Sequence, residues 1–593
     1  MGTKQFLGVI DYIVIGASLL ITVGIGIISR LLSNKQMTAK EYMLAGKRMT
    51  KLPVVLSIIV TIVSPSTILS APAEIYLYGF KFAIGVFVLP IGMFLALKIF
   101  IPVYFQCGVS TVYEFLEMRY GSMIRYIISA LFLVQMIFVM VVSLFGSVLS
   151  LSAVTDLSLE ISVISLGALC TLYCSLGGLK AVLWTDVFQA ALIFICMASL
   201  YVAGIGDAGG IAKIYEQAKE GHRLDMFDLR LDLTNRHDFW ACVFRGIIFG
   251  IGFYGTNQVE VQRLLSLSNI KKANKTFLIT IIPASLSFLS CHVLGLIMYS
   301  VYYHCDPVLN KEQSGVSRYD QIVPDYMIKK FSSIPGMTGI CIAGLFSASL
   351  STISSCLNSA ATVTVVDFIK PLYKRGEISD VKTVWLVKIL CVVYGCASIG
   401  LSFCFLEVRS LVQLLNVMLN SLEGPMLAVF LTGVLTRKGG DKSISFSLIV
   451  GYIVMTWIGF GSLNSKYVQP PLPLSIDMCP SRNVSSQTDI AFLECTTTGN
   501  CTSSISQTAK PTEDTFYLYK ISFLWYCFIG FVLTQAVIFI TILATGWRKN
   551  VIPEDSLCLS PVTRIWNKPK TPNLNDVNKE NEKDENYDLT FRM

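Results

Sequence analysis

Apolar residues form long runs along almost the whole chain, and short polar segments separate them. Thirteen runs are each long enough to cross the ~30 Å hydrocarbon core of a membrane as a helix. They cover residues 10–30, 53–72, 82–105, 124–151, 160–178, 186–206, 238–262, 276–301, 333–358, 382–404, 410–435, 443–463 and 519–546. The pattern predicts an all-α polytopic membrane protein with about 13 transmembrane helices.

Composition supports this prediction. The chain has 593 residues, of which 53% are hydrophobic and 15% are charged, and its mean hydropathy is +0.62. A soluble protein is nearer 25% charged. The net charge of +8 is modest and the basic residues lie in short loops, so we expect the lipid bilayer as a partner and no nucleic acid. The first apolar run is long enough to span by itself, so no cleavable signal peptide is expected.

An odd number of spans places the two termini on opposite sides of the membrane. Lys and Arg gather in alternate loops, which is typical of cytoplasmic loops. These loops are 31–52, 263–275, 370–381 and 436–442, and the tail begins with Arg548 and Lys549. We therefore predict a plasma-membrane protein with its N-terminus outside and its C-terminus in the cytoplasm. Glycosylation sequons at Asn483 and Asn500 agree, because loop 464–518 is then extracellular.

The predicted outside loops hold four cysteines, at Cys305, Cys479, Cys495 and Cys501. An oxidising compartment allows one or two disulfides among them, and the sequence leaves the pairing open. Only four histidines exist, and none has metal-ligand spacing with cysteine, so no metal centre is expected. The polar tail, residues 547–593, is predicted to be a disordered cytoplasmic segment.

Polar residues inside two apolar runs predict broken helices. In the second run Pro65 lies between Ser64 and Ser66; it has no N–H to donate and clashes with a preceding carbonyl. The freed carbonyl oxygens must bond to a cation, to water or to neighbouring helices. In the seventh run, residues 249–258 combine three glycines with Phe253, Tyr254 and Asn257. This composition favours either an unwound helix that lines a cavity or close helix packing.

The ninth run carries a stripe of hydroxyl and amide groups at helical spacing. Its members are Ser347, Ser351, Ser354 or Ser355, and Asn358. Hydroxyl oxygens are hard ligands that suit a hard cation. Serine and threonine also favour close packing of membrane helices, so the stripe alone leaves both interpretations open.

Two acids add to this pattern. Asp186 lies at the predicted cytoplasmic mouth of the sixth run, where it would attract a cation, cap a helix or pair with a base. Glu423 lies in the middle of the eleventh run, where a charge costs ~2.5–3.5 kcal/mol. It is therefore expected to be protonated, paired or part of a transport site. The broken second and seventh runs stand five helices apart, as in two repeated halves with a binding site at their broken helices.

Several segments resemble the sodium/solute symporter family. They are 178–182, 184–189, 350–352 with Asn358, 362–365 and 367–371. Within that family, 110–120, 305–307, 320–324 and 470–473 resemble the branch of sodium-coupled monocarboxylate, multivitamin and iodide transporters more than the sugar transporters. The resemblance runs from about residue 10 to about residue 546.

This resemblance implies a LeuT-like core of two inverted five-helix repeats and alternating access driven by sodium. The repeats would cover 53–206 and 238–435. The outlying parts would be 1–52, the extracellular loop 207–237, the peripheral spans within 436–546, and the tail 547–593.

The resemblance also implies site residues. The main sodium ion would bind Val60, Val63, Ala348, Ser351 and Thr352. A further sodium ion would bind near Thr61, Ser354 and Ser355, and Asp186 would lie on the inward sodium route. The predicted substrate cavity contains Ser64, Ser66, Thr67, Phe253, Tyr254, Asn257 and Glu423. Sodium is the coupling ion, and no other cofactor is expected.

Three positions depart from the family pattern. Thr67 is shorter than the residue of the iodide and sugar transporters, Pro65 replaces small residues, and Glu423 replaces a glycine. We predict a symporter that imports a small organic anion, such as a monocarboxylate or an acidic vitamin. The alternatives are iodide, a sugar or a choline-like cation as cargo, or a sodium-dependent sensor that does not transport. No nucleophile–base pair or nucleotide loop occurs in the runs, so an enzyme is not expected.

Overall fold

Helices account for nearly all of the regular structure in the computed structural model. It describes residues 7–31, 38–152, 158–373, 378–404, 411–465, 469–479 and 516–565, and contains no strand within them. The longer helices are α1 (Val9–Leu31), α3 (Lys51–Ile62), α4 (Pro65–Tyr78), α5 (Ile84–Ile99), α8 (Ser122–Ser152), α9 (Leu159–Asp207), α11 (Phe239–Gly255), α13 (Ile270–Val301), α16 (Met337–Val363), α18 (Asp380–Cys404), α19 (Leu411–Leu435), α20 (Asp441–Asn464) and α21 (Tyr526–Thr545).

Shorter helices join these long ones. They are α2 (Ala39–Leu44), α6 (Ile101–Cys107), α7 (Val112–Arg119), α10 (Ile211–Glu220), α12 (Gln258–Leu265), α14 (Lys311–Ser314), α15 (Ile322–Phe331) and α17 (Lys370–Leu372). Single turns of 3₁₀ or π helix complete the set at η1 (Ala45–Lys47), η2 (Phe80–Ala83), η3 (Tyr319–Gln321), η4 (Thr364–Ile369), η5 (Tyr517–Lys520) and η6 (Pro561–Ile565).

The predicted spans correspond to these helices. Within the described residues, ten helices are long and apolar enough to cross a membrane, and the bent pairs α3–α4 and α11–α12 raise the number to twelve. Helix α9 has 49 residues, or ~74 Å at 1.5 Å per residue, which is more than twice the thickness of a membrane core. Gly178 breaks it at a positive φ of 60°, so α9 contains two of the predicted spans.

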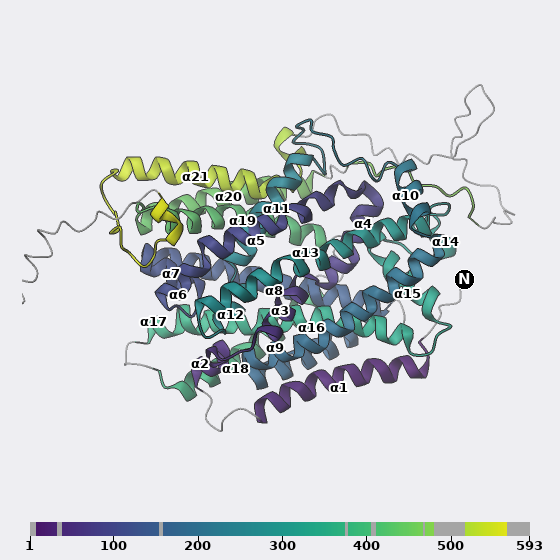
Figure 1. Cartoon of the computed structure of the whole chain (residues 1–593), viewed down its shortest axis with the longest axis horizontal. Helices are drawn as coiled ribbons and strands as arrows, with labels where there is room; N and C mark the ends of the chain where they lie inside the picture. The colour runs from purple at the N-terminus through teal and green to yellow at the C-terminus, as the bar shows by residue number, and fades with distance from the viewer. Residues whose placement is uncertain are drawn as a thin grey trace, which may run out of the picture.

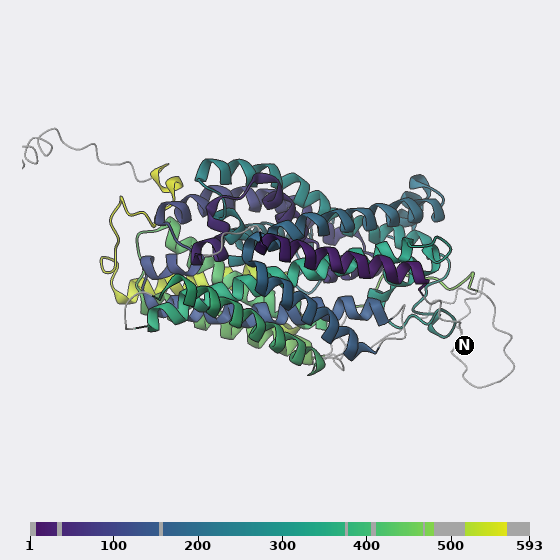
Figure 2. The same ribbon diagram turned by 90° about the horizontal axis from the view of Figure 1, so that it is seen from below.

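The bundle is built around α16. Over an apolar stretch of 18 residues in α16, 94% are buried, whereas the values for such stretches of α1 and α21 at the periphery are 28% each. Figures 1 and 2 show the long helices running roughly side by side, with α1 on the outside of the bundle. The largest helix contacts join α16 to α9 and α11 to α5. The polar stripe of the ninth run therefore lies in the middle of the protein and not at a lipid-facing surface.

Close packing explains part of the glycine pattern in the seventh run. A Cβ atom at Gly250 would lie 2.8 Å from the Cα of Gly92 on α5, and a Cβ at Gly92 would lie 2.4 Å from the Ile247 carbonyl oxygen. Real Cβ atoms do not approach backbone this closely, so glycine at these positions lets α5 and α11 touch.

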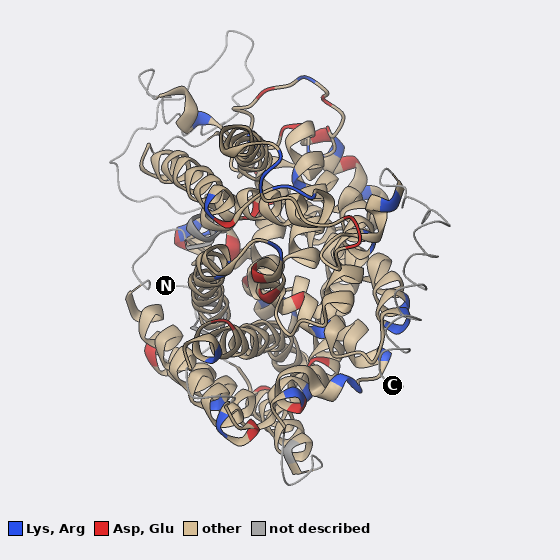
Figure 3. Cartoon of the chain, turned by 90° about the vertical axis from the view of Figure 1, so that its left-hand side faces the viewer, with Lys and Arg blue, Asp and Glu red and all other residues tan. Residues whose placement is uncertain are grey.

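The two ends of the bundle carry different connections. At one end lie α10, α14, α15 and the start of α1, and a disulfide joins Cys305 to Cys479 there. At the other end lie α2, α6, α7 and η6, which Figure 3 views face on. The first and last described residues lie at opposite ends (Figures 1 and 2), as an odd number of spans requires. Cys495, Cys501, Asn483 and Asn500 lie outside the described residues.

The prediction that the whole tail is disordered is wrong for its first part. The Ile552 amide donates to the Arg437 carbonyl at 2.9 Å, and the Ser560 amide donates to the Val434 carbonyl at 2.8 Å. Cys558 and Leu559 are buried, so this polar segment still contributes apolar contacts. The composition of the tail as a whole missed this docking, because seven of the fifteen residues 551–565 are apolar while the residues after 565 are mostly polar.

Candidate binding cavity and the closed end behind it

A cavity of about 670 Å³ lies among α4, α8, α11, α13 and α19. Its mouth is lined by residues such as Arg236, Arg318, Gln469 and Lys520, so it opens toward the end that carries the disulfide. We call this the open end, and the opposite end, with α2, α6 and α7, the closed end. Six of the seven residues predicted for the substrate cavity line it, namely Ser64, Ser66, Thr67, Phe253, Asn257 and Glu423.

Tyr254, the seventh, lies elsewhere. Its ring packs against Phe277 with 5.5 Å between centroids, and the side chain is fully buried away from the cavity. Residues 249–258 thus present Phe249, Gly252, Phe253 and Asn257 to the cavity, while Tyr254 belongs to the packing behind it.

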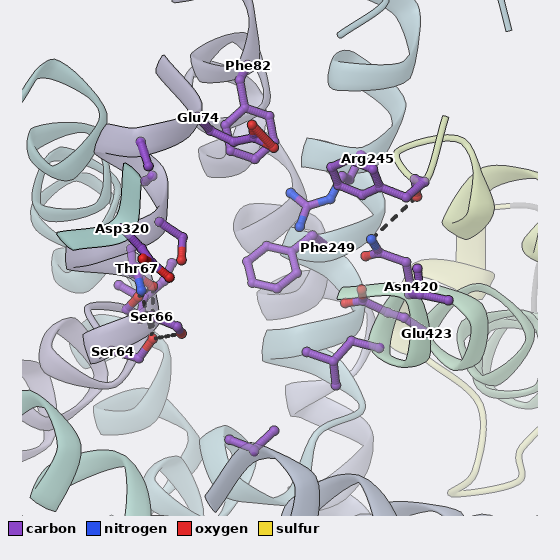
Figure 4. Close-up of a pocket in the computed structure, with 18 of the residues that line it drawn as sticks. Ser64, Ser66, Thr67, Glu74, Phe82, Arg245, Phe249, Asp320, Asn420 and Glu423 are labelled. Atoms are coloured by element: carbon purple, nitrogen blue, oxygen red, sulfur yellow. Dashed lines mark hydrogen bonds between the residues drawn. The ribbon is translucent and has the colours of Figure 1, made fainter. Parts of the chain in front are cut away.

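The break predicted at Pro65 is present and faces the cavity. Helix α3 ends at Ile62, α4 begins at Pro65, and the two are bent by 47°. The Ser64 hydroxyl accepts the Thr67 amide at 3.2 Å and lies 2.8 Å from the Ser66 hydroxyl. These hydroxyls stand on one wall of the cavity (Figure 4). Because the break supplies polar groups to open space, it suits recognition of a polar ligand.

The second predicted break is also present, but its polar groups bond within the protein. Helices α11 and α12 are bent by 51° around Thr256 and Asn257. The Gly255 carbonyl accepts the Tyr104 hydroxyl at 2.6 Å, and the Gly252 carbonyl accepts the Thr256 amide at 2.8 Å. The Asn257 side chain caps α12 by accepting the Val259 amide at 2.9 Å.

The hydroxyl groups predicted to bind sodium lie where α16 passes the end of α3, and the two helices are in contact. Thr352 lines the cavity, and its hydroxyl donates to the Ala348 carbonyl at 2.9 Å. Ser351, on the next face, donates to the Asp186 carboxylate at 2.6 Å. At the break, the Val63 amide donates to the Val60 carbonyl at 3.0 Å.

The three residues predicted for a further sodium ion differ in the hydrogen bonds that their hydroxyl groups make. The Thr61 hydroxyl lines the cavity and donates to the Ser57 carbonyl at 2.8 Å, and the Ser354 hydroxyl donates to the Ser351 carbonyl at 3.2 Å. The Ser355 hydroxyl instead accepts a hydrogen bond from the Arg263 guanidinium at 2.7 Å. A fixed cation beside Ser355 opposes the binding of a second cation there.

Asp186 belongs to a buried polar network that fills the bundle behind the cavity, toward the closed end. The Ser57 hydroxyl donates to Asp186, and the Arg263 guanidinium lies 4.0 Å from it. Arg263 also donates to Ser57 at 2.6 Å and to Glu260 at 2.7 Å. Asp186, Arg263 and Glu260 are each 1% exposed or less. The network joins α3, α9, α12 and α16 because Asp186 and Arg263 each have partners on more than one helix. We call it the Arg263 network.

Charges inside the cavity follow a different pattern. Two arginines near the mouth are paired, Arg236 with Glu74 and Arg318 with Asp320. Arg245 also lines the cavity, on α11, and within the described part of the chain it has no hydrogen-bond or ion-pair partner. Its Nε atom is enclosed without a partner, and the guanidinium lies 5.8 Å from the Phe82 ring and 5.6 Å from the Phe249 ring.

Sequence reasoning missed Arg245, although the signal was available. An arginine inside an apolar run is costly and marks a functional site by default, which is the argument that identified Glu423. Figure 4 shows Arg245, Phe249 and Glu423 along one wall, opposite Ser64, Ser66 and Thr67. Among described groups, the Glu423 carboxylate accepts one long hydrogen bond, from the Cys527 thiol at 3.6 Å.

Comparison with known proteins gives consistent results. The family described as Sodium:solute symporter family matches residues 42–451. Sodium-coupled monocarboxylate transporter 1 of Homo sapiens is 32% identical over 554 residues, covering 91% of this chain and 88% of that protein. Sodium-coupled monocarboxylate transporter 2 of Bos taurus is 33% identical over 490 residues, covering 82% and 78%.

The fold is also similar to a solved structure. A Na⁺-coupled sialic acid symporter, solved in a substrate-bound outward-open state, superposes with a TM-score of 0.72 over 91% of this chain and 98% of that one. Sequence identity between the two is 20%, so this likeness concerns the fold, which is LeuT-like.

Proposed function

The chain belongs to the sodium:solute symporter family and is a sodium-coupled solute symporter, not an enzyme, and we propose that its cargo is a small organic carboxylate. The unpaired guanidinium of Arg245 in the cavity carries this proposal. A guanidinium fork matches a carboxylate with two parallel hydrogen bonds, and such charge-assisted bonds are the strong ones. The relatives that carry monocarboxylates support the same class of cargo.

Arg245 also separates this proposal from the other predicted cargoes. A choline-like cation would be repelled by it, and a sugar has no charge to meet it. Iodide would meet the charge but cannot use the directional fork. The aromatic wall of Phe249 and Phe253, stacked with 5.1 Å between centroids, suits the apolar part of a short organic acid.

For sodium, we keep the site predicted from the family, at the carbonyls of Val60, Val63 and Ala348 and the hydroxyls of Ser351 and Thr352. The Val60 carbonyl accepts the Val63 amide and has a second lone pair for an ion. For a further sodium ion, Thr61 and Ser354 are better candidates than Ser355, because Arg263 bonds to Ser355. Asp186 then lies between the main ion and Arg263, on the inward route.

Alternating access requires one end of the protein to open while the other is closed, and the cavity here is open at one end only. We propose that the open end is extracellular, so that the cavity takes up sodium and cargo from outside. The mouth residues lie in or beside segments predicted to be extracellular, and the disulfide at this end agrees with an oxidising compartment. The protein would then lie in the plasma membrane with its N-terminus on the extracellular side. Release inward requires the Arg263 network to separate.

The bent pairs α3–α4 and α11–α12 would begin the two inverted repeats, 53–206 and 238–435.

The sodium gradient supplies enough free energy for uptake. One sodium ion crossing ~60 mV down a tenfold gradient gives ~2.8 kcal/mol. The potential opposes the entry of an anionic cargo by ~1.4 kcal/mol, so one sodium ion accumulates such a cargo about tenfold and a second ion would raise that ratio.

Uptake into proteoliposomes that contain the full chain tests this function. The panel is lactate, butyrate, biotin, iodide, glucose and choline, each with sodium and with N-methyl-D-glucamine in its place. We expect sodium-dependent accumulation of at least one carboxylate and its loss by about tenfold or more in Arg245→Gln, because a charge-assisted bond is removed. Arg230→Gln, at an exposed loop arginine, is the matched control and should transport normally. Sodium-dependent uptake of glucose or choline alone would overturn the proposal.

A further inference from the structure

Two opposite charges share the cavity without forming an ion pair. Arg245 on α11 and Glu423 on α19 both line it, and no ion pair joins them among the described residues. Arg236 and Arg318, which line the same cavity, each bond directly to an acid. If Arg245 and Glu423 served only to neutralise each other, direct contact would be expected, because a partly buried charge is costly when left alone. Their separation leaves room for a ligand between them.

The positions of the two groups set the size of that ligand. Glu423 packs over Gly252, where a Cβ atom would lie 3.2 Å from the Oε1 of Glu423. Gly252 is seven residues after Arg245 on α11, which corresponds to two turns and ~10 Å along the helix. A bridging molecule must therefore be short, with its charged groups a few bonds apart.

The surface between the charges is apolar and aromatic. Phe249 lies one turn from Arg245 on the cavity face of α11, and Phe253 lies one further turn along, beside Gly252. These rings suit a short aliphatic linker, and their faces attract an ammonium group at the Glu423 end. The absence of a side chain at Gly252 keeps the Glu423 carboxylate accessible from the cavity.

We propose that the preferred cargo is a small zwitterion, an amino carboxylate whose carboxylate binds Arg245 and whose cationic nitrogen binds Glu423. The proposal rests on the proposed function, since it takes the carboxylate at Arg245 as given and adds a second charged end. It makes Arg245 the residue required for every carboxylate and Glu423 the residue that selects those carrying an amine.

Matched pairs of compounds test the idea in the wild-type chain. The pairs are glycine and acetate, β-alanine and propionate, 4-aminobutyrate and butyrate, and 6-aminohexanoate and hexanoate, measured as sodium-dependent uptake into proteoliposomes that contain the full chain. We expect at least one amino form to exceed its partner about tenfold in kcat/KM, since a hydrogen bond to a charged group is worth that factor or more. Butylamine, which has the amine and no carboxylate, should not be transported.

Two variants then test which residue binds the carboxylate of the cargo and which binds its amine. Glu423→Gln should bring the amino form and its partner within about twofold of each other, while Arg245→Gln should lower the uptake of both about tenfold or more. Glu216→Gln, an exposed residue on α10, is the matched control and should keep the wild-type preference. If Glu423→Gln does not reach a folded state, the wild-type pairs still decide the matter.

The failures are distinguishable. Uptake of simple acids that equals or exceeds their amino forms at every chain length would overturn the zwitterion proposal and leave the carboxylate symporter standing. Sodium-dependent uptake of neither series would overturn both.

Discussion

The open end and the closed end of this protein both contain buried charge, but they use it in opposite ways. In the Arg263 network Asp186 and Arg263 each bond to side chains of other helices, and α3, α9, α12 and α16 are joined through them. Glu260 bonds to Arg263 on the same helix. At the open end, Arg245 has no polar partner among the described residues, and Glu423 accepts a single long hydrogen bond.

This difference separates structural from binding roles more clearly than burial does. A charge whose hydrogen bonds are made within the protein holds helices together, and its loss is expected to affect stability. A charge left without a partner in a cavity is available to a ligand, and its loss is expected to affect transport. Both broken helices line the cavity: the Gly255 carbonyl at the α11–α12 break is taken up by Tyr104, while the α3–α4 break presents the hydroxyls of Ser64, Ser66 and Thr67 to the cavity.

The largest effect is expected from Arg263→Gln. Removing this guanidinium leaves Asp186 and Glu260 buried without a counter-charge, which costs ~3–5 kcal/mol for a broken buried pair. We expect a marked fall in the thermal unfolding temperature of the detergent-solubilised protein and low surface expression.

A second substitution sharpens this test. Arg263→Gln combined with Glu260→Gln should be more stable than Arg263→Gln alone, because one uncompensated charge is removed as well. Arg230→Gln, at an exposed ion pair, should leave the unfolding temperature unchanged. An Arg263→Gln protein as stable as the wild type would show that the network does not lock the closed end.

An intermediate effect is expected where the two ends meet, at neighbouring hydroxyls of α16. Thr352 faces the cavity and Ser351 bonds to Asp186, so their alanine variants should differ. Thr352→Ala should raise the sodium concentration for half-maximal uptake by up to about tenfold, because the variant loses one contact to the ion that is about as strong as a hydrogen bond. The stability of the protein should not change. Ser351→Ala should change both quantities. Sodium titration of uptake measures the first quantity, and thermal unfolding measures the second. Identical behaviour of the two variants would contradict the claim that Thr352 belongs to the cavity and Ser351 to the Arg263 network.

The smallest effect is expected from Gly252→Ala. The new Cβ would lie 3.2 Å from the Glu423 carboxylate, a flexible group that can shift, so stability should change little. We expect a change of about twofold in cargo preference, measured with 4-aminobutyrate and butyrate. Gly92→Ala is the contrast, because its Cβ would meet the Ile247 backbone at 2.4 Å and should destabilise the protein by ~1–3 kcal/mol. Equal stability losses in both variants would contradict this account of Gly252.

The spans and both helix breaks could be predicted from the sequence because their signals are local. Apolar run length sets the spans, and Pro65 and the glycines near Gly255 set the breaks. The pairing of Cys305 with Cys479 depends on how loops 174 residues apart meet, which no local pattern records. The docking of Cys558 and Leu559 depends on the surface they meet, so composition could not show it.

The candidate site was only partly predictable for a similar reason. The family resemblance, added to the predicted helix break and to the acid inside a span, allowed Ser64, Thr67 and Glu423 to be predicted for the cavity that they line. Whether a polar group has a partner depends on residues far away in the chain. Ser355 looks like a sodium ligand until Arg263 is seen to bond to it, and Arg245 stands out only when its lack of a partner is visible.

The measurement that tests the central claim most directly is thermal unfolding of the purified wild-type chain and of Arg245→Gln in sodium, each with and without butyrate or 4-aminobutyrate. A ligand at a hundred times its Kd stabilises a protein by ~2.7 kcal/mol, so we predict a clear rise in Tm for the wild type with at least one of the two. Arg245→Gln should show the wild-type Tm without ligand and no rise with either. A rise of the same size in Arg245→Gln, or a loss of its stability in the absence of ligand, would contradict the claim that the unpaired charge at the open end exists to bind cargo.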